Sequence, residues 1–355
     1  SAVGVVQRGF GARLARLDAT AGRLRRAAWW SGVVLAAAVS IYAHVEIASP
    51  MIPYRGGVFT PTRIYLRGQV LTSYTVVTID LNQVMLSNLM VQIGNHTNAA
   101  VDENMVRHMV LNSLRSYKVK FGEEYGEMII ACDNTNYWRK QIFPYYKANR
   151  KKNIENSELN WKAIFDCLGK LRAELKDHFA YRIIDIESAE ADDIIAVLCR
   201  EYSSDENIMI LSGDKDFIQL QQYPNVKQYD PVRKKAITHP NPVAYRNEHI
   251  MKGDTGDGVP NILSPDNCFV VGERQKPLTQ KKIDKYLSGE PMSAEVARNY
   301  ARNRQLIDLS MVPTDISEKI IESYESQEDK KPKDLVNYFI ANRLKNLMEN
   351  IQEFA

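Results

Sequence analysis

The chain has 355 residues, of which 45% are apolar and 25% are charged, a composition typical of a soluble globular protein with a sizeable core. The net charge is +3, but residues 1–50 carry +4 and the remainder, with 40 basic and 41 acidic residues, carries −1. This excludes a uniformly basic nucleic-acid-binding protein, and four widely spaced cysteines without a CxxC pair argue against a disulfide framework or zinc ribbon.

The first 70 residues differ in composition from the rest of the chain. They contain no Lys and no Asn, whereas residues 71–355 hold 24 Asn, so the two parts resemble sequences of different origin. Six Arg precede an uncharged stretch at 27–43, whose 17 residues are marginal for a membrane span of about 20. Three interpretations of residues 1–70 stay open: a membrane anchor, a helix packed on the body, or an extraneous fusion or upstream translation.

Residues 71–239 alternate between strand and helix patterns. Short apolar runs predict four strands, at 75–79, 127–132, 181–184 and 207–211. Helical patterns lie between them, for instance at 102–118 and 159–178. This alternation predicts an α/β core with a parallel sheet and helices on both faces. A hairpin is expected at 226–238 around Asp230-Pro231, and residues 240–355 are expected to be helical.

A carboxylate follows each of the four predicted strands. The acids are Asp80, Asp133, Glu190, Asp192, Asp193, Asp214 and Asp216. Because the carboxyl ends of parallel strands form the ligand crevice of an open sheet, we expect these side chains to converge on one edge. So many carboxylates cannot lie together ionised without cations, and their oxygens suit Mg²⁺, for which Mn²⁺ is expected to substitute. Two such ions can activate water and stabilise the leaving oxygen of a phosphodiester.

The segment SGDKDF (212–217) holds two of these acids with Lys215 between them. Alternation along an extended strand would turn Lys215 away from the metal ions. We therefore expect Lys215 to be dispensable.

A glycine-rich segment, MKGDTGDGVPNI (251–262), supplies Asp254 and Asp257 to the same set of acids. Its glycines at 253, 256 and 258 permit tight turns, and such a loop can present backbone N–H groups to a phosphate. The six histidines show no metal-ligand spacing and are interpreted as structural or surface residues.

Residues 134–154 combine cations with aromatic rings and contain no acid. The cations are Arg139, Lys140, Lys147, Arg150, Lys151 and Lys152, and the rings belong to Tyr137, Trp138, Phe143, Tyr145 and Tyr146. Lys and Arg neutralise backbone phosphates, and aromatic rings stack on unpaired bases. The segment therefore predicts a nucleic-acid-binding arm over the acidic edge, with a solvated amphipathic helix as the alternative.

Several motifs resemble those of the 5′-nuclease (flap endonuclease) superfamily, in particular its branch of ribonucleases H from T-even-type bacteriophages. They are TIDLNQ (78–83), ACDNTNYWRK (131–140), YYKANR (145–150), EADDIIAVL (190–198), SGDKDF (212–217), YPNVKQYDPVRKK (223–235) and KGDTGDGVP (252–260). The resemblance runs from about Val76 to Phe354. It implies an α/β fold with a parallel-sheet, PIN-like 5′-nuclease core at 71–239, a helical arch at 134–154, and a helical DNA-binding region at 240–355 containing a helix–three-turn–helix-like element.

The resemblance implies an Mg²⁺-dependent 5′-3′ exonuclease and flap endonuclease that removes RNA primers and 5′ flaps in DNA replication. The implied metal ligands are Asp80, Asp133, Glu190, Asp192, Asp193, Asp214, Asp216, Asp254 and Asp257, with Asp133 and Asp214 also catalytic. Lys147 and Arg139 are implied to contact the scissile phosphate, and Tyr146 to stack on the terminal base. The implied nucleic-acid-binding residues are Tyr137, Trp138, Arg139, Lys140, Tyr146, Lys147, Arg150, Lys151, Lys152, Lys252, Gly253, Gly256 and Gly258.

The resemblance also implies partners. These are branched or RNA-primed duplex DNA, a monovalent cation at the 253–258 loop, and a single-strand-binding protein at the C-terminal helices near 313–354. Clamp binding is not implied, since residues 1–70 do not match the family's N-terminal tail. The sequence departs from the family at Gly258, where Asn is usual, and at 263–282, which replaces a GVGxKTA-like segment.

Three alternative functions stay open at this point. They are a PIN-like ribonuclease, a non-catalytic branched-DNA-binding protein, and a membrane-tethered factor that uses residues 27–43. The expected location is the cytoplasm, that of the host cell if the protein is phage-encoded.

Overall fold

The computed structural model describes residues 64–66, 69–71, 76–93, 101–157 and 159–354. The apolar stretch 27–43 lies outside these residues. Two short strands, β1 (Ile64–Leu66) and β2 (Gln69–Leu71), pair antiparallel. Within the described ranges, no helix is both long enough and apolar enough to cross a membrane.

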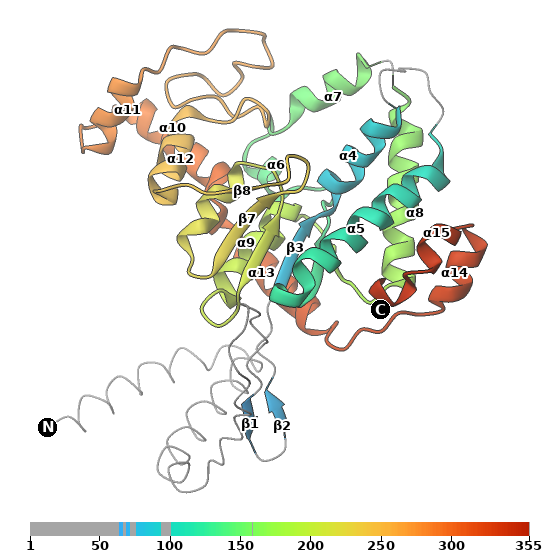
Figure 1. The fold of residues 1–355 in the computed structure, drawn as a ribbon. Coiled ribbons are helices and arrows are strands. Elements are labelled where there is room, and N and C mark those ends of the chain that lie inside the picture. The colour runs from blue at the N-terminus through green and yellow to red at the C-terminus, as the bar shows by residue number, and fades with distance from the viewer. Residues whose placement is uncertain (1–63, 67–68, 72–75, 94–100, 158, 355) are drawn as a thin grey trace, which may run out of the picture. The chain divides into compact units, whose positions relative to one another are not determined.

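The core of the protein is a mixed, mostly parallel sheet (Figure 1). Its strands are β3 (Val76–Asp80), β4 (Glu127–Ala131), β5 (Arg182–Ile184), β6 (Ile208–Leu211), β7 (Val226–Asp230) and β8 (Lys235–Ile237). In the described part of the chain their order is β5-β4-β3-β6-β7-β8, parallel throughout except that β8 pairs antiparallel with β7. The four predicted strands and the predicted hairpin are confirmed.

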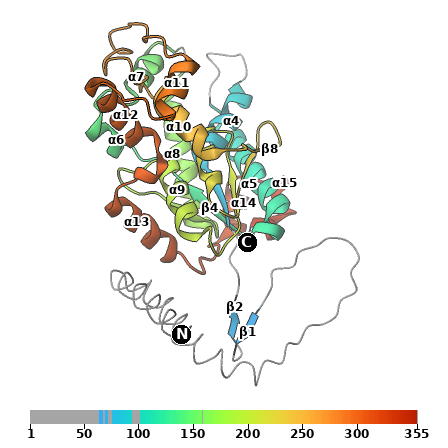
Figure 2. The same ribbon diagram turned by 90° about the vertical axis from the view of Figure 1, so that its left-hand side faces the viewer.

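Both faces of the sheet are covered because its strands are apolar on both sides. In β4, Met128 and Ile130 belong to one buried cluster, and Ile129 and Ala131 belong to another. Successive strand residues point to opposite faces, so a continuous apolar run requires packing on each. The first face is covered by α4 (Leu81–Ile93), α5 (Glu103–Tyr125) and α8 (Trp161–His178), and the second by α9 (Ala191–Tyr202), η2 (Asp216–Gln222) and α13 (Thr314–Glu325) (Figures 1 and 2).

Local sequence signals fix the ends of the predicted helices. The Asp102 side chain accepts hydrogen bonds from the backbone N–H groups of Asn104 and Met105 and so caps α5. That helix runs beyond its predicted end to Tyr125 and stops where Gly126 takes a φ of 65°. Asn160 caps α8 in the same way.

The predicted arm contains two short helices. These are α6 (Trp138–Ile142) and α7 (Ala148–Glu155), separated by a turn. Its turn is attached to the glycine-rich loop, because the backbone N–H of Lys147 donates to the carbonyl oxygen of Asp257 at 2.8 Å.

The C-terminal region is helical only in part. Its further elements are α10 (Pro242–Lys252), α11 (Gln280–Leu287), α12 (Ala294–Ile307), η3 (Leu309–Met311), α14 (Leu335–Ala341), α15 (Lys345–Met348) and η4 (Ile351–Phe354). The expectation of helix throughout was wrong for 253–279, where a bridge between Asp254 and Val259 is followed by turns. Glycines and prolines interrupt helix in this segment.

The last helices return to the core. Phe339 and Phe354 are fully buried in the same cluster as the β3 and β4 side chains, and the Tyr338 hydroxyl donates to Glu174 of α8 at 2.7 Å. In the described part of the core, α10 also packs on η2 and α13 on α9.

Candidate metal centre

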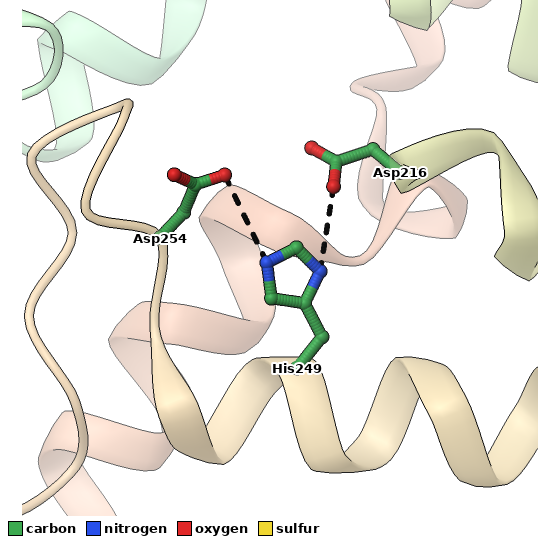
Figure 3. Close-up of side chains that lie close together, drawn as sticks. All are labelled: Asp216, His249 and Asp254. Atoms are coloured by element: carbon green, nitrogen blue, oxygen red, sulfur yellow. Dashed lines mark ion pairs between the residues drawn. The ribbon is translucent and has the colours of Figure 1, made fainter. Parts of the chain in front are cut away.

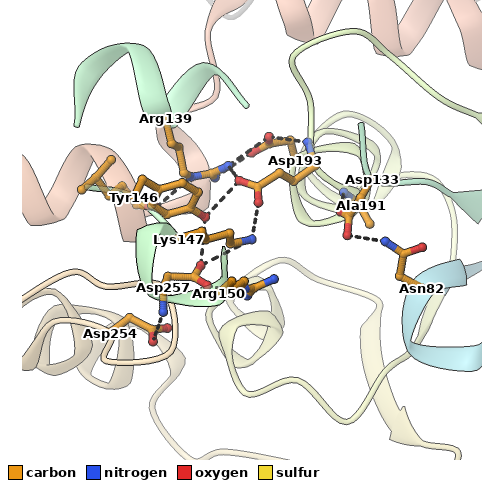
Figure 4. Close-up of polar contacts among 12 residues, drawn as sticks. Asn82, Asp133, Arg139, Tyr146, Lys147, Arg150, Ala191, Asp193, Asp254 and Asp257 are labelled. Atoms are coloured by element: carbon orange, nitrogen blue, oxygen red, sulfur yellow. Dashed lines mark hydrogen bonds and ion pairs between the residues drawn. The ribbon is translucent and has the colours of Figure 1, made fainter. Parts of the chain in front are cut away.

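Three carboxylates at or just beyond strand ends and one from the first turn of α9 form what we call the inner acid cluster. Its members are Asp80, Asp133, Asp192 and Asp214. They meet because β4, β3 and β6 are adjacent and parallel, and α9 begins beside the same edge. Asp133 is held by the Ala191 backbone N–H and the Asn82 side chain, each at 2.7 Å (Figure 4).

The electrostatics of the inner acid cluster show an excess of negative charge. Burial, followed by repulsion from Asp133 and Asp214, raises the pKa of Asp80 to about 7. Burial and repulsion from Asp214 likewise raise the pKa of Asp192 well above its usual value. A cation within the cluster would relieve this repulsion, so the donor set fits a hard divalent ion with oxygen ligands.

A second group, which we call the outer site, consists of Asp216, His249 and Asp254 (Figure 3). One potential ligand atom from each lies within 4.8 Å of the others. Asp216 begins η2, His249 lies in the last turn of α10, and Asp254 follows the residue that caps this helix. Asp192 of the inner acid cluster lines one small cavity together with Asp216 and Asp254, so the two groups are neighbours.

Glu190 and Asp193 lie with the other acids but are already paired. Both are buried and bind the buried guanidinium of Arg139, which meets Asp193 with two nitrogens at 2.6 and 3.0 Å and Glu190 with one at 2.6 Å (Figure 4). Asp193 also accepts from the Trp138 indole, and together with Glu190 it forms a capping box on α9.

This arrangement differs from the sequence-based expectation for Arg139. Its side chain is 2% exposed, and its Nε binds the Leu306 carbonyl oxygen. The guanidinium therefore has no free face for a scissile phosphate in this structure, and it is in position to hold α6 against α9. Trp138, expected to bind nucleic acid, is buried beside it.

The turn of the arm is anchored to Asp257. Arg150 pairs with Asp257 at 2.6 Å, and the Tyr146 hydroxyl lies 2.9 Å from Asp257 and 3.0 Å from Glu190 (Figure 4). Tyr146 is buried, so its ring is not exposed for stacking on a base, contrary to expectation. Burial alone would raise the pKa of the Asp257 carboxyl. The opposing effect of Lys147 and Arg150 is larger, so the pKa lies below its usual value and the carboxyl stays ionised.

Lys147 lies between Glu190 and Asp257 in the same network. It forms an ion pair with Glu190 and approaches Asp257 at 3.6 Å. Burial lowers the pKa of its ammonium group, but Asp257 and Glu190 raise it more, so the group remains protonated at neutral pH. Its backbone adopts a φ of 55°, an uncommon conformation for a residue other than glycine.

The remaining expected nucleic-acid contacts lie toward the surface. Lys140 is exposed with its ammonium over the Tyr137 ring at 4.8 Å, and Lys252 is exposed beside Glu248. In the glycine-rich loop, Gly256 is exposed and Gly258 is buried near Tyr145. The side chains of Lys151 and Lys152, in α7, lie outside the described residues.

A pocket of about 600 Å³ opens between the end of β6 and the glycine-rich loop. Asp214, Lys215 and Asp216 line it together with His249 and Asp254. The strand ends at Leu211, and the Asp216 backbone N–H donates to Asp214 in a turn. The alternation argument for Lys215 therefore does not apply, and this side chain lines the same pocket as the two acids.

The glycine-rich loop depends on Gly253. Its φ is 70°, and a Cβ atom there would lie 2.4 Å from the Val259 carbonyl oxygen and 2.6 Å from the Pro260 carbonyl carbon. Gly272 has a similar φ of 75°, but no atom lies within 4 Å of the position of its Cβ.

Gly253→Ala is expected to destabilise the protein by more than about 2 kcal/mol, because it adds a backbone clash to the left-handed conformation. Gly272→Ala should cost only the conformational term, about 1 kcal/mol. Urea unfolding followed by tryptophan fluorescence measures the free energy of unfolding of both variants. Equal losses would show that the backbone around Gly253 moves to accommodate a Cβ atom without cost.

Two contributors to the site were missed by the sequence reasoning. His249 was interpreted as structural, yet it lies between two acids of the outer site. Asn82 follows the first strand-end acid and binds Asp133, a role that the sequence gives no means to assign. His249 stands five residues before Asp254, and this closeness in sequence is the signal that could have suggested a shared site.

Most of the chain matches known protein families. Residues 79–250 match the family model of the 5′-3′ exonuclease N-terminal resolvase-like domain, and residues 246–354 match that of the C-terminal domain of T4 RNase H. The ribonuclease H of Enterobacteria phage T4 is 34% identical over 292 residues, covering 78% of this chain and 94% of that protein. A flap endonuclease Xni of Shewanella piezotolerans is 29% identical over 157 residues, covering 41% of this chain and 56% of that protein.

The fold is similar to that of the flap endonuclease of bacteriophage T5. A structure of that enzyme with DNA and metal ions aligns with a TM-score of 0.51 at 16% identity, covering 72% of this chain and 99% of that one. A second T5 structure, co-crystallised with metal ions, aligns with a TM-score of 0.50 over 71% of this chain.

Proposed function

The chain belongs to the 5′-3′ exonuclease family that includes T4 ribonuclease H, and is thus a structure-specific 5′ nuclease; we propose that it uses Mg²⁺ to remove RNA primers and 5′ flaps during DNA replication. The observation that carries the proposal is the inner acid cluster, in which four carboxylates from separate elements meet at one edge of the sheet. The described arm and glycine-rich loop, which the PIN-like alternative lacks, favour this function.

The acids divide between two adjacent metal positions in this proposal. Asp80, Asp133, Asp192 and Asp214 would hold one ion, and Asp216 and Asp254 a second. Bound divalent ions would supply an activated water and stabilisation of charge on the phosphodiester. Glu190, Asp193 and Asp257 act through the side chains they bind, since cations of this chain occupy them in the structure.

Lys147 is the residue we assign to the scissile phosphate. It remains charged at neutral pH and its turn is fixed by the Asp257 backbone. A phosphate at the acidic edge would offer this ammonium a further acceptor. Arg139 serves as a positioning residue that joins the arm to α9 through Glu190 and Asp193.

Substrate and partner surfaces follow the same edge. Exposed Lys140, Arg150 and Lys252 are available to backbone phosphates, and the 253–258 loop would receive duplex DNA together with a monovalent cation. At the other end of the chain, Val336 and Ile340 on α14 are 53% and 59% exposed. They offer an apolar strip for a single-strand-binding protein, and the expected location is the host-cell cytoplasm.

Cleavage assays with the full chain test the proposal. A 5′-flap DNA and an RNA-primed duplex should each release short 5′ products in millimolar Mg²⁺ and none in EDTA, while an unbranched duplex is cut slowly. Tight binding of the flap without cleavage in Mg²⁺ or Mn²⁺ would instead support the non-catalytic branched-DNA-binding alternative.

Stabilisation by Mg²⁺ is expected to depend on pH. The folded-state pKa of Asp80, about 7, lies above that of an unfolded Asp, so its contribution to stability is full below about pH 4 and is lost as the pH rises through about 7. A bound cation reverses that loss by stabilising the ionised form.

The rise in melting temperature caused by millimolar Mg²⁺ should therefore be larger at about pH 8 than at about pH 6. Differential scanning calorimetry of metal-free protein measures it, with NaCl of equal ionic strength as the control. Equal gains at both pH values would show that these carboxylates do not receive the ion.

A further inference from the structure

His249 occupies an unusual position between two carboxylates. Its Nδ1 lies 3.4 Å from an oxygen of Asp216, and its Nε2 lies 3.8 Å from an oxygen of Asp254 (Figure 3). The side chain is 17% exposed, and those of Asp216 and Asp254 are 22% and 25% exposed. All three are therefore reachable from the pocket that they line.

The fold fixes the imidazole at this point from three directions. Asn241 caps α10 at its start, and α10 packs on η2, which places His249 beside Asp216. At the other end, Gly253 terminates α10 and turns the chain so that Asp254 lies across the ring. None of these contacts uses a ring nitrogen of His249.

One of those nitrogens is unsatisfied. Nδ1 of His249 is buried and has no hydrogen-bond partner. Buried polar atoms are nearly always paired, so an orphan beside two carboxylates requires an explanation. In a metal site with bonds of about 2.0–2.2 Å, neighbouring ligand atoms lie about 3–3.5 Å apart, and the 3.4 Å between Nδ1 and Asp216 falls in that range.

We propose that Asp216, His249 and Asp254 form a mixed nitrogen–oxygen site that binds a first-row transition ion, such as Zn²⁺ or Mn²⁺, in preference to Mg²⁺. One ring nitrogen binds the ion together with the carboxylate that it faces. The other nitrogen donates its N–H to the opposite carboxylate, which orients the ring as is common for metal-bound imidazoles. Imidazole suits Zn²⁺ and its neighbours in the series, whereas Mg²⁺ takes oxygen ligands. The inner acid cluster offers carboxylate oxygens alone, so the two positions differ in the ion they select.

This inference rests on the proposed metal-dependent function but makes a narrower claim about it. A bridging imidazolium that neutralises two carboxylates is the competing account. In that account both ring nitrogens carry protons, and neither can bind a metal ion.

Pulsed electron paramagnetic resonance of Mn²⁺ distinguishes the two accounts without measuring activity. Metal-free full-length protein with two equivalents of Mn²⁺ should show ¹⁴N modulation from a coordinated imidazole. Bound Mn²⁺ with no ¹⁴N coupling in the unaltered protein would overturn the proposal, and this readout does not depend on any variant folding.

Variants then assign the nitrogen to His249. His249→Asn should abolish the coupling and weaken Zn²⁺ binding at one site by at least tenfold in calorimetric titration, while Mg²⁺ affinity changes less than threefold. His178→Asn is the matched control, since that ring packs on Tyr338 with Nδ1 facing the Lys333 carbonyl oxygen; it should retain both signals. Unchanged Zn²⁺ affinity in folded His249→Asn protein would also overturn the site.

Failure of this inference is separable from failure of the proposed function. Flap cleavage in Mg²⁺ without ¹⁴N coupling would leave the nuclease function intact and reject the nitrogen ligand. Nitrogen coupling without cleavage on any flap or primer substrate would support the metal site and reject the proposed reaction.

Discussion

Replacing Asp214 by Asn is expected to reduce Mg²⁺-dependent cleavage of a 5′-flap substrate by roughly 10³-fold while binding of the same DNA persists. Metal-ion catalysis contributes several kcal/mol of charge stabilisation in the transition state, and each 1.4 kcal/mol corresponds to about tenfold in rate. Asp214 is exposed beyond the end of β6, where it faces Asp80 and Asp192 and lines the pocket of about 600 Å³.

Asp205→Asn provides the matched control for this substitution. Asp205 is an exposed acid at the opposite end of β6, just before the strand begins, and its carboxylate accepts a hydrogen bond from Ser204. Single-turnover rates and fluorescence-anisotropy binding curves measure both steps. Full cleavage by Asp214→Asn in Mg²⁺ would remove the inner acid cluster from the mechanism.

Replacing Arg139 by Ala is expected to lower the free energy of unfolding by about 3–5 kcal/mol, because it leaves buried Asp193 without a cation and Glu190 with Lys147 alone. Glu190 and Asp193 are 1% and 0% exposed, so water cannot take the place of the guanidinium. The loss should appear in urea denaturation of metal-free protein, before any substrate is added.

Lys140→Ala separates this structural role from a general effect of losing a cation in the arm. Lys140 is the next residue of α6 but is exposed, and its removal should change stability by no more than about 0.5 kcal/mol. An Arg139→Ala protein of unchanged stability but impaired cleavage would return Arg139 to the scissile phosphate.

The structure gives the arm and the acidic edge a shared framework. Glu190 pairs with Arg139 and Lys147, and Asp257 pairs with Lys147 and Arg150 (Figure 4). The Tyr146 hydroxyl lies within hydrogen-bond distance of both carboxylates. Glu190 and Asp257, which could otherwise bind metal ions, are thus paired with cationic side chains of this chain. The network fixes the turn that carries Lys147 directly beside the inner acid cluster.

The strand pattern and the acids that follow the strands were readable from the sequence. A buried parallel strand requires a short apolar run, and its carboxyl end is defined within a residue or two by where that run stops. The sequence alone therefore predicts Asp80 and Asp214 at one edge of the sheet. The arm and the glycine-rich loop could also be recognised from local sequence. The arm is a dense run of cations and aromatic rings, and the loop is a dense run of glycines and aspartates.

Which residues pair with the buried charged side chains depends on the tertiary structure. The sequence could show Arg139, Tyr146 and His249 as a cation, a ring and a histidine, but their roles depend on residues more than thirty positions away. Arg139 became a buried pair because α6 packs on α9, and His249 became a candidate ligand because α10 packs on η2. Local sequence fixes where an acid or cation lies along the chain, whereas burial and pairing arise only when distant elements exclude water between them.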